Sequence, residues 1–356
     1  PSLVTIEELL QLLVERKASD LHISAGVPPK LRIEGKLVST EHQVLTPEVS
    51  KKLVFSILDD GQKARFEREL ELDMSFGITG LGRFRTNVFV QRGAVACAIR
   101  AIPYEILTME QLGLPREVCE KLCALPRGLI LVTGSTGSGK STTLATMIDF
   151  INRGRYEHII TVEDPIEFLH HSKNCLVNQR EIGADTHSFG ESLRHILRQD
   201  PDIILIGEMR DIETIETALV LSETGHLTFA TLHTSDCAQT INRIVDVFPA
   251  HKQQQVRTML SFTLQAIFCQ QLLPRSHGRG RVLAAEVMLA TPAIRALIRD
   301  DKAHQIYSMI QTSGKMGMRT MNQSLFELYR ANAITFEEAL EHSSDPEELK
   351  RISQRG

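Results

Sequence analysis

The sequence lacks an apolar run of the roughly 18 residues that a membrane-spanning helix requires. It also lacks an excess of positive charge, since 40 Lys and Arg stand against 44 Asp and Glu for a formal net charge of −4. Domains that bind nucleic acids are usually basic, so we expect no nucleic-acid partner. No signal-peptide pattern is present at the start, where residues 1–5 lead directly into a helical pattern. These absences together predict a cytoplasmic protein.

Cysteines are few and scattered. Of the six, only Cys119 and Cys123 lie close together, and no second pair or histidine cluster accompanies them. A zinc site built from neighbouring cysteine pairs is therefore disfavoured, and we interpret these two residues as helix thiols. We expect no zinc, and free thiols, as is usual in the cytosol.

What the chain does contain is a glycine-rich segment that fits the pattern G-x-x-x-x-G-K-[ST] at every fixed position. The apolar run 129–132 predicts a buried strand before it, and apolar residues at helical spacing in 142–152 predict a helix after it. A strand, a glycine loop and a helix start gather backbone N–H groups around a phosphate. Lys140 would reach the β- and γ-phosphates of ATP, and the Ser141 hydroxyl would ligate Mg²⁺. The predicted nucleotide-binding residues are Gly134, Ser135, Thr136, Gly137, Ser138, Gly139, Lys140, Ser141 and Thr142.

The length of 356 residues suggests two domains. Residues 1–102 mix helical patterns with alternating stretches joined by turns, which predicts a small α+β domain with an antiparallel sheet. Residues 103–115 are bounded by prolines, lack periodicity and predict a linker. Residues 116–356 alternate strands and helices, which predicts an α/β domain with a mostly parallel sheet covered on both sides. Within this domain we expect 238–271 and 292–356 to be mainly helical, with a hairpin near 281–288.

Two acids end predicted strands of the second domain. Glu163 follows 159–162, and Glu208 follows 203–207. Ligands of open α/β sheets bind at the carboxyl ends of the strands. We assign Glu208 to Mg²⁺, directly or through water, and Glu163 to the attacking water, which it would orient or deprotonate. The alternative for each is a surface acid at the end of a strand.

Four basic side chains are further candidates. His226 and His233 flank the predicted strand 228–232, either as polar surface or as sensors of a phosphate. On the predicted strand 83–89, the period of two places Arg83 and Arg85 on one face. That face is either simply solvated, or its two guanidinium groups contact a phosphate bound by another domain or subunit, because Arg bonds phosphate oxygens bidentately.

These segments together resemble the secretion ATPases of the type II/type IV pilus superfamily. The resemblance rests on the glycine loop and on the segments 161–168, 197–202, 207–211 and 224–234. Together they are similar to the family's Walker A, aspartate box, atypical Walker B and histidine box, in the family's order. The segment 82–87 is also similar to the family's arginine-bearing strand. The resemblance implies a RecA-like P-loop core with a small PAS-like N-terminal domain, in a homohexamer that binds ATP between domains. It implies catalytic roles for Glu163, Glu208, His226, His233, Arg83 and Arg85.

Within that superfamily the chain is most similar to the retraction ATPases. Its N-terminal domain is single and short, and the four-cysteine insert that often follows the histidine box in the other branches is missing. The resemblance implies a motor for twitching motility that acts on a membrane platform protein at the pilus base, peripherally attached to the inner membrane. A pilus-assembly or type II secretion ATPase is the alternative within the family. A slow nucleotide-gated switch and a nucleic-acid translocase are alternatives outside it.

The segment 293–299 is similar to a C-terminal segment that the family associates with retraction. Its helical period places Ile294, Leu297 and Ile298 on one face, and Arg295 and Arg299 on another. We expect the apolar face to pack on its own domain and the arginine face to meet a neighbouring subunit or the platform protein.

Overall fold

The computed structural model describes residues 3–356. The first two residues, which belong to the start where no signal peptide is expected, lie outside the described range. Contacts divide the chain into two compact units, Pro1–Pro103 and Tyr104–Gly356, and each is described by itself. Among the described residues, no helix has both the length and the apolar composition needed to cross a membrane.

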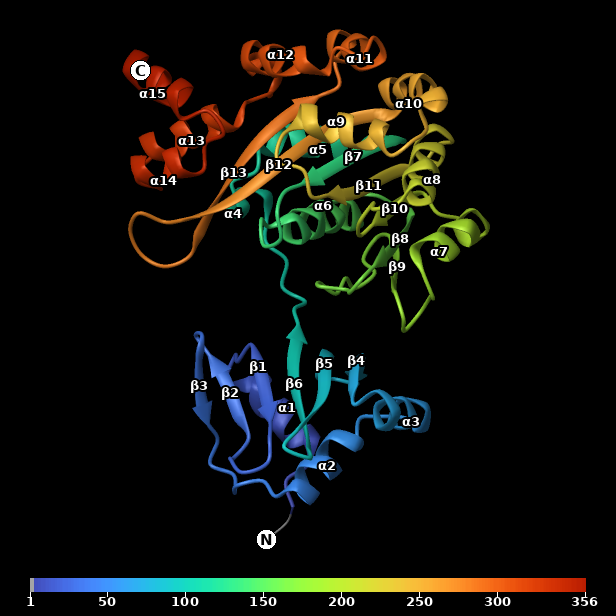
Figure 1. Ribbon diagram of the computed structural model, residues 1–356, viewed down its shortest axis with the longest axis vertical. Coiled ribbons are helices and arrows are strands. Elements are labelled where there is room, and N and C mark those ends of the chain that lie inside the picture. The colour runs from blue at the N-terminus through green and yellow to red at the C-terminus, as the bar shows by residue number, and fades with distance from the viewer. Residues whose placement is uncertain (1–2) are drawn as a thin grey trace. The chain divides into compact units, whose positions relative to one another are not determined.

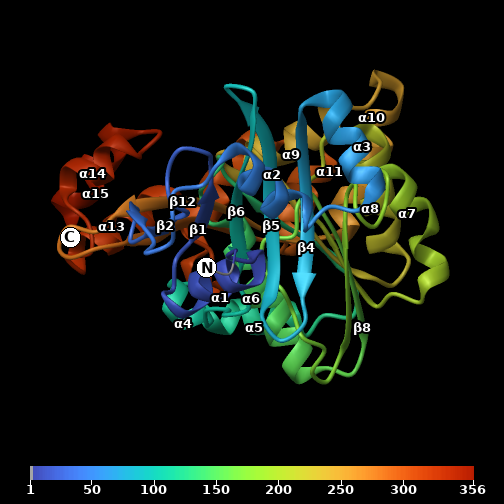
Figure 2. The ribbon, with the colours of Figure 1, turned by 90° about the horizontal axis from the view of Figure 1, so that it is seen from below.

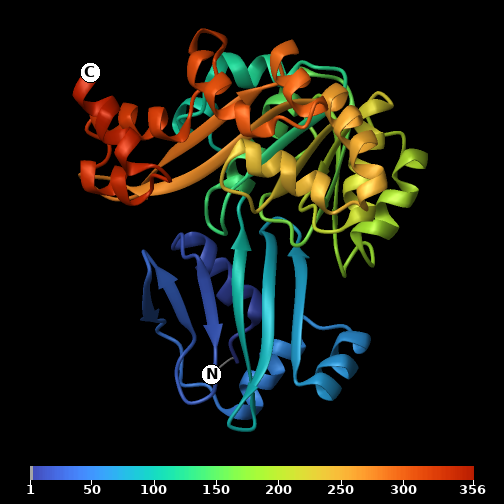
Figure 3. The ribbon, with the colours of Figure 1, turned by 45° about the horizontal axis from the view of Figure 1, so that its top comes forward.

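The first unit is a six-stranded antiparallel sheet with three helices (Figure 1). Its elements are α1 (Ile6–Glu15), β1 (Asp20–Ile23), β2 (Lys30–Ile33), β3 (Lys36–Ser39), α2 (Pro47–Phe55), α3 (Asp60–Glu69), β4 (Glu71–Ile78), β5 (Gly82–Gln91) and β6 (Ala94–Ile102). The strand order is β3-β2-β1-β6-β5-β4. The long strands β4, β5 and β6 run side by side in Figures 2 and 3.

Strand β5 alternates as its sequence predicts. Phe84 and Val88 are buried in the core of the unit, whereas Arg85 and Asn87 are exposed on the other face. Arg83, at the start of the strand, is half-buried. The period of two in the sequence therefore reports which face of the sheet carries the basic residues.

The second unit is built on a seven-stranded sheet in the order β13-β12-β7-β11-β10-β8-β9. Its strands are β7 (Gly128–Thr133), β8 (His158–Glu163), β9 (Leu176–Glu181), β10 (Ile203–Ile206), β11 (Leu227–Leu232), β12 (Leu264–Pro274) and β13 (Arg281–Leu289). Its α-helices are α4 (Met109–Leu112), α5 (Arg116–Cys123), α6 (Lys140–Gly154), α7 (Phe189–Ile196), α8 (Ile212–Glu223), α9 (Cys237–Asp246), α10 (Ala250–Thr263), α11 (Pro292–Arg299), α12 (Ile306–Thr312), α13 (Met321–Arg330), α14 (Phe336–Glu341) and α15 (Pro346–Arg355). All neighbouring strands are parallel except the pair β12–β13.

Two hydrophobic cores lie on the two faces of this sheet, as strand β7 illustrates. Ile130 and Val132 point into the core that helices α4, α5 and α6 cover. Leu129 and Leu131 point into the opposite core, which is covered by α7 to α12. A strand buried on both faces reads as a continuous apolar run, and this explains the 129–132 pattern. The predicted α/β architecture, a P-loop sheet covered by helices on both sides, is confirmed.

The region around β12 differs from its prediction. Residues 264–271, which we expect to be helical, belong to the eleven-residue strand β12, and the expected hairpin at 281–288 is the single strand β13. The two strands form one long antiparallel hairpin, whose turn lies between Pro274 and Arg281. The reason is that most of β12 is buried on both faces. Its sequence therefore does not alternate between apolar and polar residues, and without that alternation a strand cannot be distinguished from a buried helix.

The stretch 103–115, interpreted as a linker, is more ordered than its composition suggests. It contains α4, which begins with a capping box formed by Thr108 and Gln111. Met109 and Leu114 are buried in the core beneath α5 and α6. By its contacts this stretch from Tyr104 onward therefore belongs to the second unit.

The C-terminal helices α13, α14 and α15 form a separate cluster (Figures 1 and 2). They pack on Leu273 and Ala284 of the β12–β13 hairpin. In α11, Ile294 and Ile298 are buried, as the helical period predicts. Arg295 differs from the expectation, because it donates to Ser261 O at 2.7 Å and to Gln265 Oε1 at 3.2 Å within its own domain.

Candidate active site

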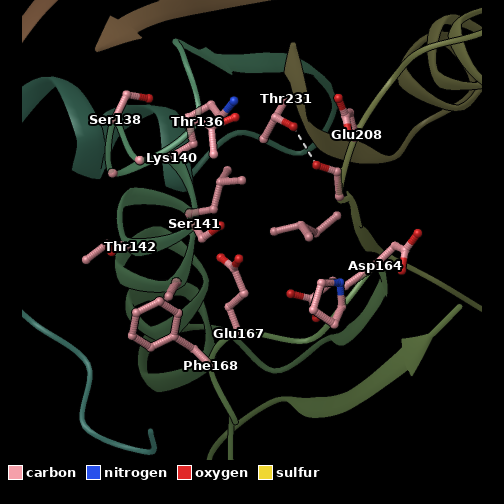
Figure 4. A pocket seen from close by; sticks show the side chains of 18 of the residues that line it. Thr136, Ser138, Lys140, Ser141, Thr142, Asp164, Glu167, Phe168, Glu208 and Thr231 are labelled. Atoms are coloured by element: carbon pink, nitrogen blue, oxygen red, sulfur yellow. Dashed lines mark hydrogen bonds between the residues drawn. The ribbon is translucent and has the colours of Figure 1, made fainter. Parts of the chain in front are cut away.

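A cavity of about 460 Å³ lies at the carboxyl ends of the parallel strands in the second unit (Figure 4). Its wall is formed by the glycine loop, the start of α6, and the ends of β8, β10 and β11. The predicted site residues that line it are Thr136, Gly137, Ser138, Gly139, Lys140, Ser141, Thr142, Glu163, Glu208 and His233. The sheet order brings together acids and a histidine that are up to 70 residues apart in the sequence, because β8, β10 and β11 are neighbours.

The glycines of the loop are required by its backbone. Gly134 has φ +147°, and a Cβ atom there would lie 2.3 Å from Ser138 Oγ and 2.6 Å from Gln270 O. Gly139, with φ +87°, is the left-handed residue just before α6. Side chains other than hydrogen are strained in that conformation. The chain thus delivers the unpaired N–H groups of the α6 start to the cavity, where they favour an anion.

Lys140 is held by the loop and by the histidine segment. Its Nζ donates to Gly134 O at 2.8 Å and lies 2.9 Å from His233 Nδ1. Lysine can only donate, so Nδ1 is the acceptor, and the imidazole carries its proton on Nε2. Nε2 lies 2.5 Å from Glu208 Oε1. A lysine, a histidine and a glutamate therefore form one connected chain along the cavity wall.

Glu208 is suited to a cation. Its Oε2 accepts from Arg210 Nη2 at 2.7 Å. Partial burial opposes its ionisation, but the hydrogen bonds and electrostatic attraction of Arg210 and His233 together outweigh the burial and lower the pKa of Glu208. The exposed Ser141 hydroxyl lies at the start of α6 on the same cavity. A carboxylate and a hydroxyl are oxygen ligands of the kind that Mg²⁺ prefers, so the donor set fits this ion.

Glu163 has a different electrostatic environment. It is half-buried at the end of β8, and its Oε2 accepts from Thr161 Oγ1 at 2.7 Å and Gln179 Nε2 at 3.2 Å. Burial raises its pKa to about 7, and the negative charge of Glu167 adds to the effect, although both hydrogen bonds oppose it. A carboxyl with a pKa near neutrality exchanges protons efficiently at the working pH of most enzymes.

Comparison with known proteins agrees with this geometry. The family model described as "Type II/IV secretion system protein" matches residues 2–341. The chain belongs to this family. It is 51% identical to the type IV pilus retraction ATPase PilT of Pseudomonas aeruginosa, over 96% of this chain and 99% of that protein. It is 46% identical to a twitching motility protein of Neisseria gonorrhoeae, over 90% of this chain and 86% of that protein.

A solved structure gives the same family and fold. A crystal structure of the pilus retraction motor PilT with bound ADP matches with a TM-score of 0.90 and 52% identity, covering 98% of this chain and 99% of that one. The resemblance to the type II/IV secretion ATPases is therefore confirmed, and so is the binding of a nucleotide by this member of the family.

Four polar residues of this family member's site do not follow from sequence reasoning alone. Arg210 pairs with Glu208, and the feature of the sequence that could have indicated this is its position two residues after that acid. Glu167 points into the cavity (Figure 4), within the segment that follows Glu163. Arg281, at the start of β13, lies across from the loop with Nη1 3.4 Å from Gly137 O, and Gln179 reaches Glu163 from β9. Arg281 and Gln179 lie on β13 and β9, and the positions of these two strands in the sheet are known from the tertiary structure and not from the sequence.

Five predicted residues do not line the cavity: Gly134 and Ser135, which belong to the glycine loop, and His226, Arg83 and Arg85. His226 precedes β11, so it stands at the opposite end of that strand from His233, and its Nδ1 lies 3.0 Å from Leu221 O. A phosphate-sensing role for His226 requires a phosphate outside this cavity. Arg83 and Arg85 are on β5 in the first unit.

Proposed function

We propose that this chain is the ATP-hydrolysing motor of type IV pilus retraction and acts as a homohexamer. The observation that carries the proposal is the similarity to the Pseudomonas retraction ATPase, at 51% identity over almost the full length of both chains. The chain is an ATPase. Its phosphate loop matches the full motif, and the same cavity is lined by Glu163, whose pKa is raised, and Glu208, whose pKa is lowered. The membrane platform protein of the pilus is the proposed partner, and the cytoplasmic side of the pilus base is the proposed location.

In this mechanism the α6 start and Lys140 bind the β- and γ-phosphates of ATP. Ser141 and Glu208 would hold Mg²⁺, which when bound would supply positive charge against the negative charge of the phosphates. Glu163 orients the attacking water and accepts its proton on a carboxylate oxygen, a role that its pKa of about 7 suits. When Lys140 binds a phosphate, His233 loses its contact with the lysine. Because His233 contacts Glu208 and Glu208 contacts Arg210, the positions of these side chains then depend on whether a nucleotide is bound.

The arginines of β5 are proposed to act on a phosphate held by another subunit. Arg85 lies directly opposite Arg100 on β6, an arrangement in which like charges repel each other, and of the two it is Arg100 that has a carboxylate partner, Asp20 at 2.9 Å. Arg83 has a buried Nε atom without a hydrogen-bond partner. Within residues 3–356 neither Arg83 nor Arg85 forms an ion pair. An incoming anion would relieve the repulsion and satisfy the free donors.

Changing Arg83 and Arg85 together to alanine is expected to lower ATP turnover at least about tenfold, since arginines that stabilise phosphoryl transfer contribute up to 10³–10⁵ in rate. The decisive measurement mixes this variant with Lys140→Ala subunits and follows phosphate release. Recovered activity in the mixture supports sites shared between subunits. A mixture as inactive as its parts would confine the arginines to their own chain or to a structural role.

Retraction itself is tested in cells. A strain that lacks this protein is expected to keep surface pili and to lose twitching motility, because assembly continues while disassembly stops. Restoring the wild-type chain should restore twitching, and restoring Lys140→Ala should not. A strain that loses its surface pili altogether would instead identify the chain as an assembly motor of the same family.

A further inference from the structure

Three buried side chains outside the nucleotide cavity combine the chemistry of a metal site. They are Cys237 at the start of α9, Cys269 on β12 and Glu286 on β13, and their exposed fractions are 0%, 0% and 2%. One ligand atom of each lies within 4.8 Å of the other two. None of the three lines the nucleotide cavity, so the proposed hydrolysis does not use them.

The positions of the three residues follow from the fold. Cys269 and Glu286 are direct partners in the antiparallel pair β12–β13, so their side chains leave the sheet on the same face. Helix α9 crosses that face and begins with Cys237. The two sulfur atoms are 3.7 Å apart. In a tetrahedral zinc site with Zn–S bonds of about 2.3 Å, two thiolates are roughly 3.8 Å apart.

Glu286 is an unusual residue for a hydrophobic core. Its Oε1 accepts from Cys237 N at 2.9 Å, and its Oε2 accepts from Met321 N at 3.3 Å. In the described part of the chain, no lysine or arginine pairs with it. Burial raises the pKa of Glu286 and that of the Cys237 thiol, since the charged forms are poorly solvated there. A bound divalent cation would remove this cost for both groups.

We propose that Cys237, Cys269 and Glu286 bind one Zn²⁺ ion. Two thiolates and one carboxylate select zinc over Mg²⁺ or Ca²⁺, which prefer oxygen ligands only. Binding forms two Zn–S bonds and one Zn–O bond and releases the protons of both thiols to solvent. A further oxygen is close by, because Thr240 Oγ1 lies 3.9 Å from Cys269 Sγ and 2.6 Å from Thr234 Oγ1.

The ion would join three elements next to the nucleotide site. His233, which contacts Lys140 and Glu208, is followed by Thr234 and, after two more residues, by the ligand Cys237. Zinc would therefore fix the end of the loop that carries His233 to the β12–β13 hairpin. The sequence predicts no zinc because its cysteines form no paired motif, whereas these ligands are separated by 32 residues (Cys237 to Cys269) and 49 residues (Cys237 to Glu286).

The test begins with the metal content of the full chain, purified under reducing conditions without a metal-affinity tag. We expect about one zinc per chain, released when the thiols are titrated with a mercurial reagent. Loading the chain with Co²⁺ in place of zinc should give thiolate-to-cobalt charge-transfer absorption. Because His233 and Glu208 could hold Co²⁺ as well, the sulfur bands rather than total cobalt are the readout.

A matched pair of variants assigns the site. Cys237→Ala with Cys269→Ala should lose the bound zinc and the charge-transfer bands, and Cys119→Ala with Cys123→Ala, which also removes two buried thiols, should keep both. If the first variant fails to fold, the spectrum of the wild-type chain decides. A wild-type chain without zinc, whose Co²⁺ spectrum shows no sulfur bands, would overturn the proposal and leave Glu286 as a cap for the starts of α9 and α13.

Discussion

Replacing Lys140 with alanine is expected to reduce ATP hydrolysis by at least about a hundredfold, the loss typical when one donor to developing negative charge is removed. Within residues 3–356, the hydrogen-bond partners of Nζ are Gly134 O and His233 Nδ1 at the edge of the cavity, so alanine would leave no buried charge without its partner. The variant should therefore fold. Multiple-turnover phosphate release by the purified chain is the measurement, with circular dichroism to confirm folding.

Lys121→Ala is the matched control for this variant. Its side chain is 75% exposed and pairs with the exposed Glu117, one turn away on α5. Surface pairs of this kind contribute little, so both turnover and stability should stay at the wild-type level. Undiminished turnover of Lys140→Ala would remove the phosphate loop from the mechanism, and with it the ATPase assignment.

Glu163→Gln is expected to lower turnover by about 10²–10⁴-fold, the usual contribution of a general base. The amide keeps the shape of the carboxylate but cannot accept the proton of the attacking water. ATP and Mg²⁺ should still bind, because Lys140, Ser141 and Glu208 are unchanged. Separate measurements of turnover and of nucleotide affinity by equilibrium binding distinguish the two effects.

The pH dependence of the wild-type chain should report the same group. The pKa of Glu163 is raised to about 7, so the carboxyl is protonated and inactive as a base below that pH. Turnover should thus rise as the pH increases through about 7, and Glu163→Gln should lack this rise. Folding responds in the opposite sense: because the folded state holds the proton more tightly, the stability of the fold decreases as the pH rises from 4.5 to about 7, and the neutral amide removes that penalty. The melting temperature of the variant at pH 8 should therefore not fall below that of the wild type.

Glu208→Gln separates the two acids. This change should shift the Mg²⁺ concentration needed for half-maximal turnover upward, since the amide replaces an ionised metal ligand. Saturating Mg²⁺ should restore part of the activity to this variant and none to Glu163→Gln. A metal defect in the Glu163 variant would show that the two roles are reversed.

Much of the nucleotide site is determined by the sequence alone. The phosphate loop is a local structure, because its glycines and the α6 start lie within one short segment and need no distant partner to form. Glu163 and Glu208 were identifiable because Glu163 directly follows an apolar run that forms a parallel strand, and Glu208 follows another after a single glycine. Parallel strands place their carboxyl ends on one edge of the sheet. The position of each acid at the end of its own strand was therefore sufficient to predict that the two acids lie on the same edge.

Tertiary structure alone decided the contacts between segments that are distant in the sequence. Nothing near Arg295 in sequence indicates that it is held by Ser261 and Gln265, because that contact depends on how α11 lies beside the start of β12. The same holds for Gln179, which reaches Glu163 only because β9 is the neighbour of β8. Cys269 and Glu286 meet through the register of a hairpin whose first strand is buried on both faces, and such a strand has no periodicity from which its register could be read.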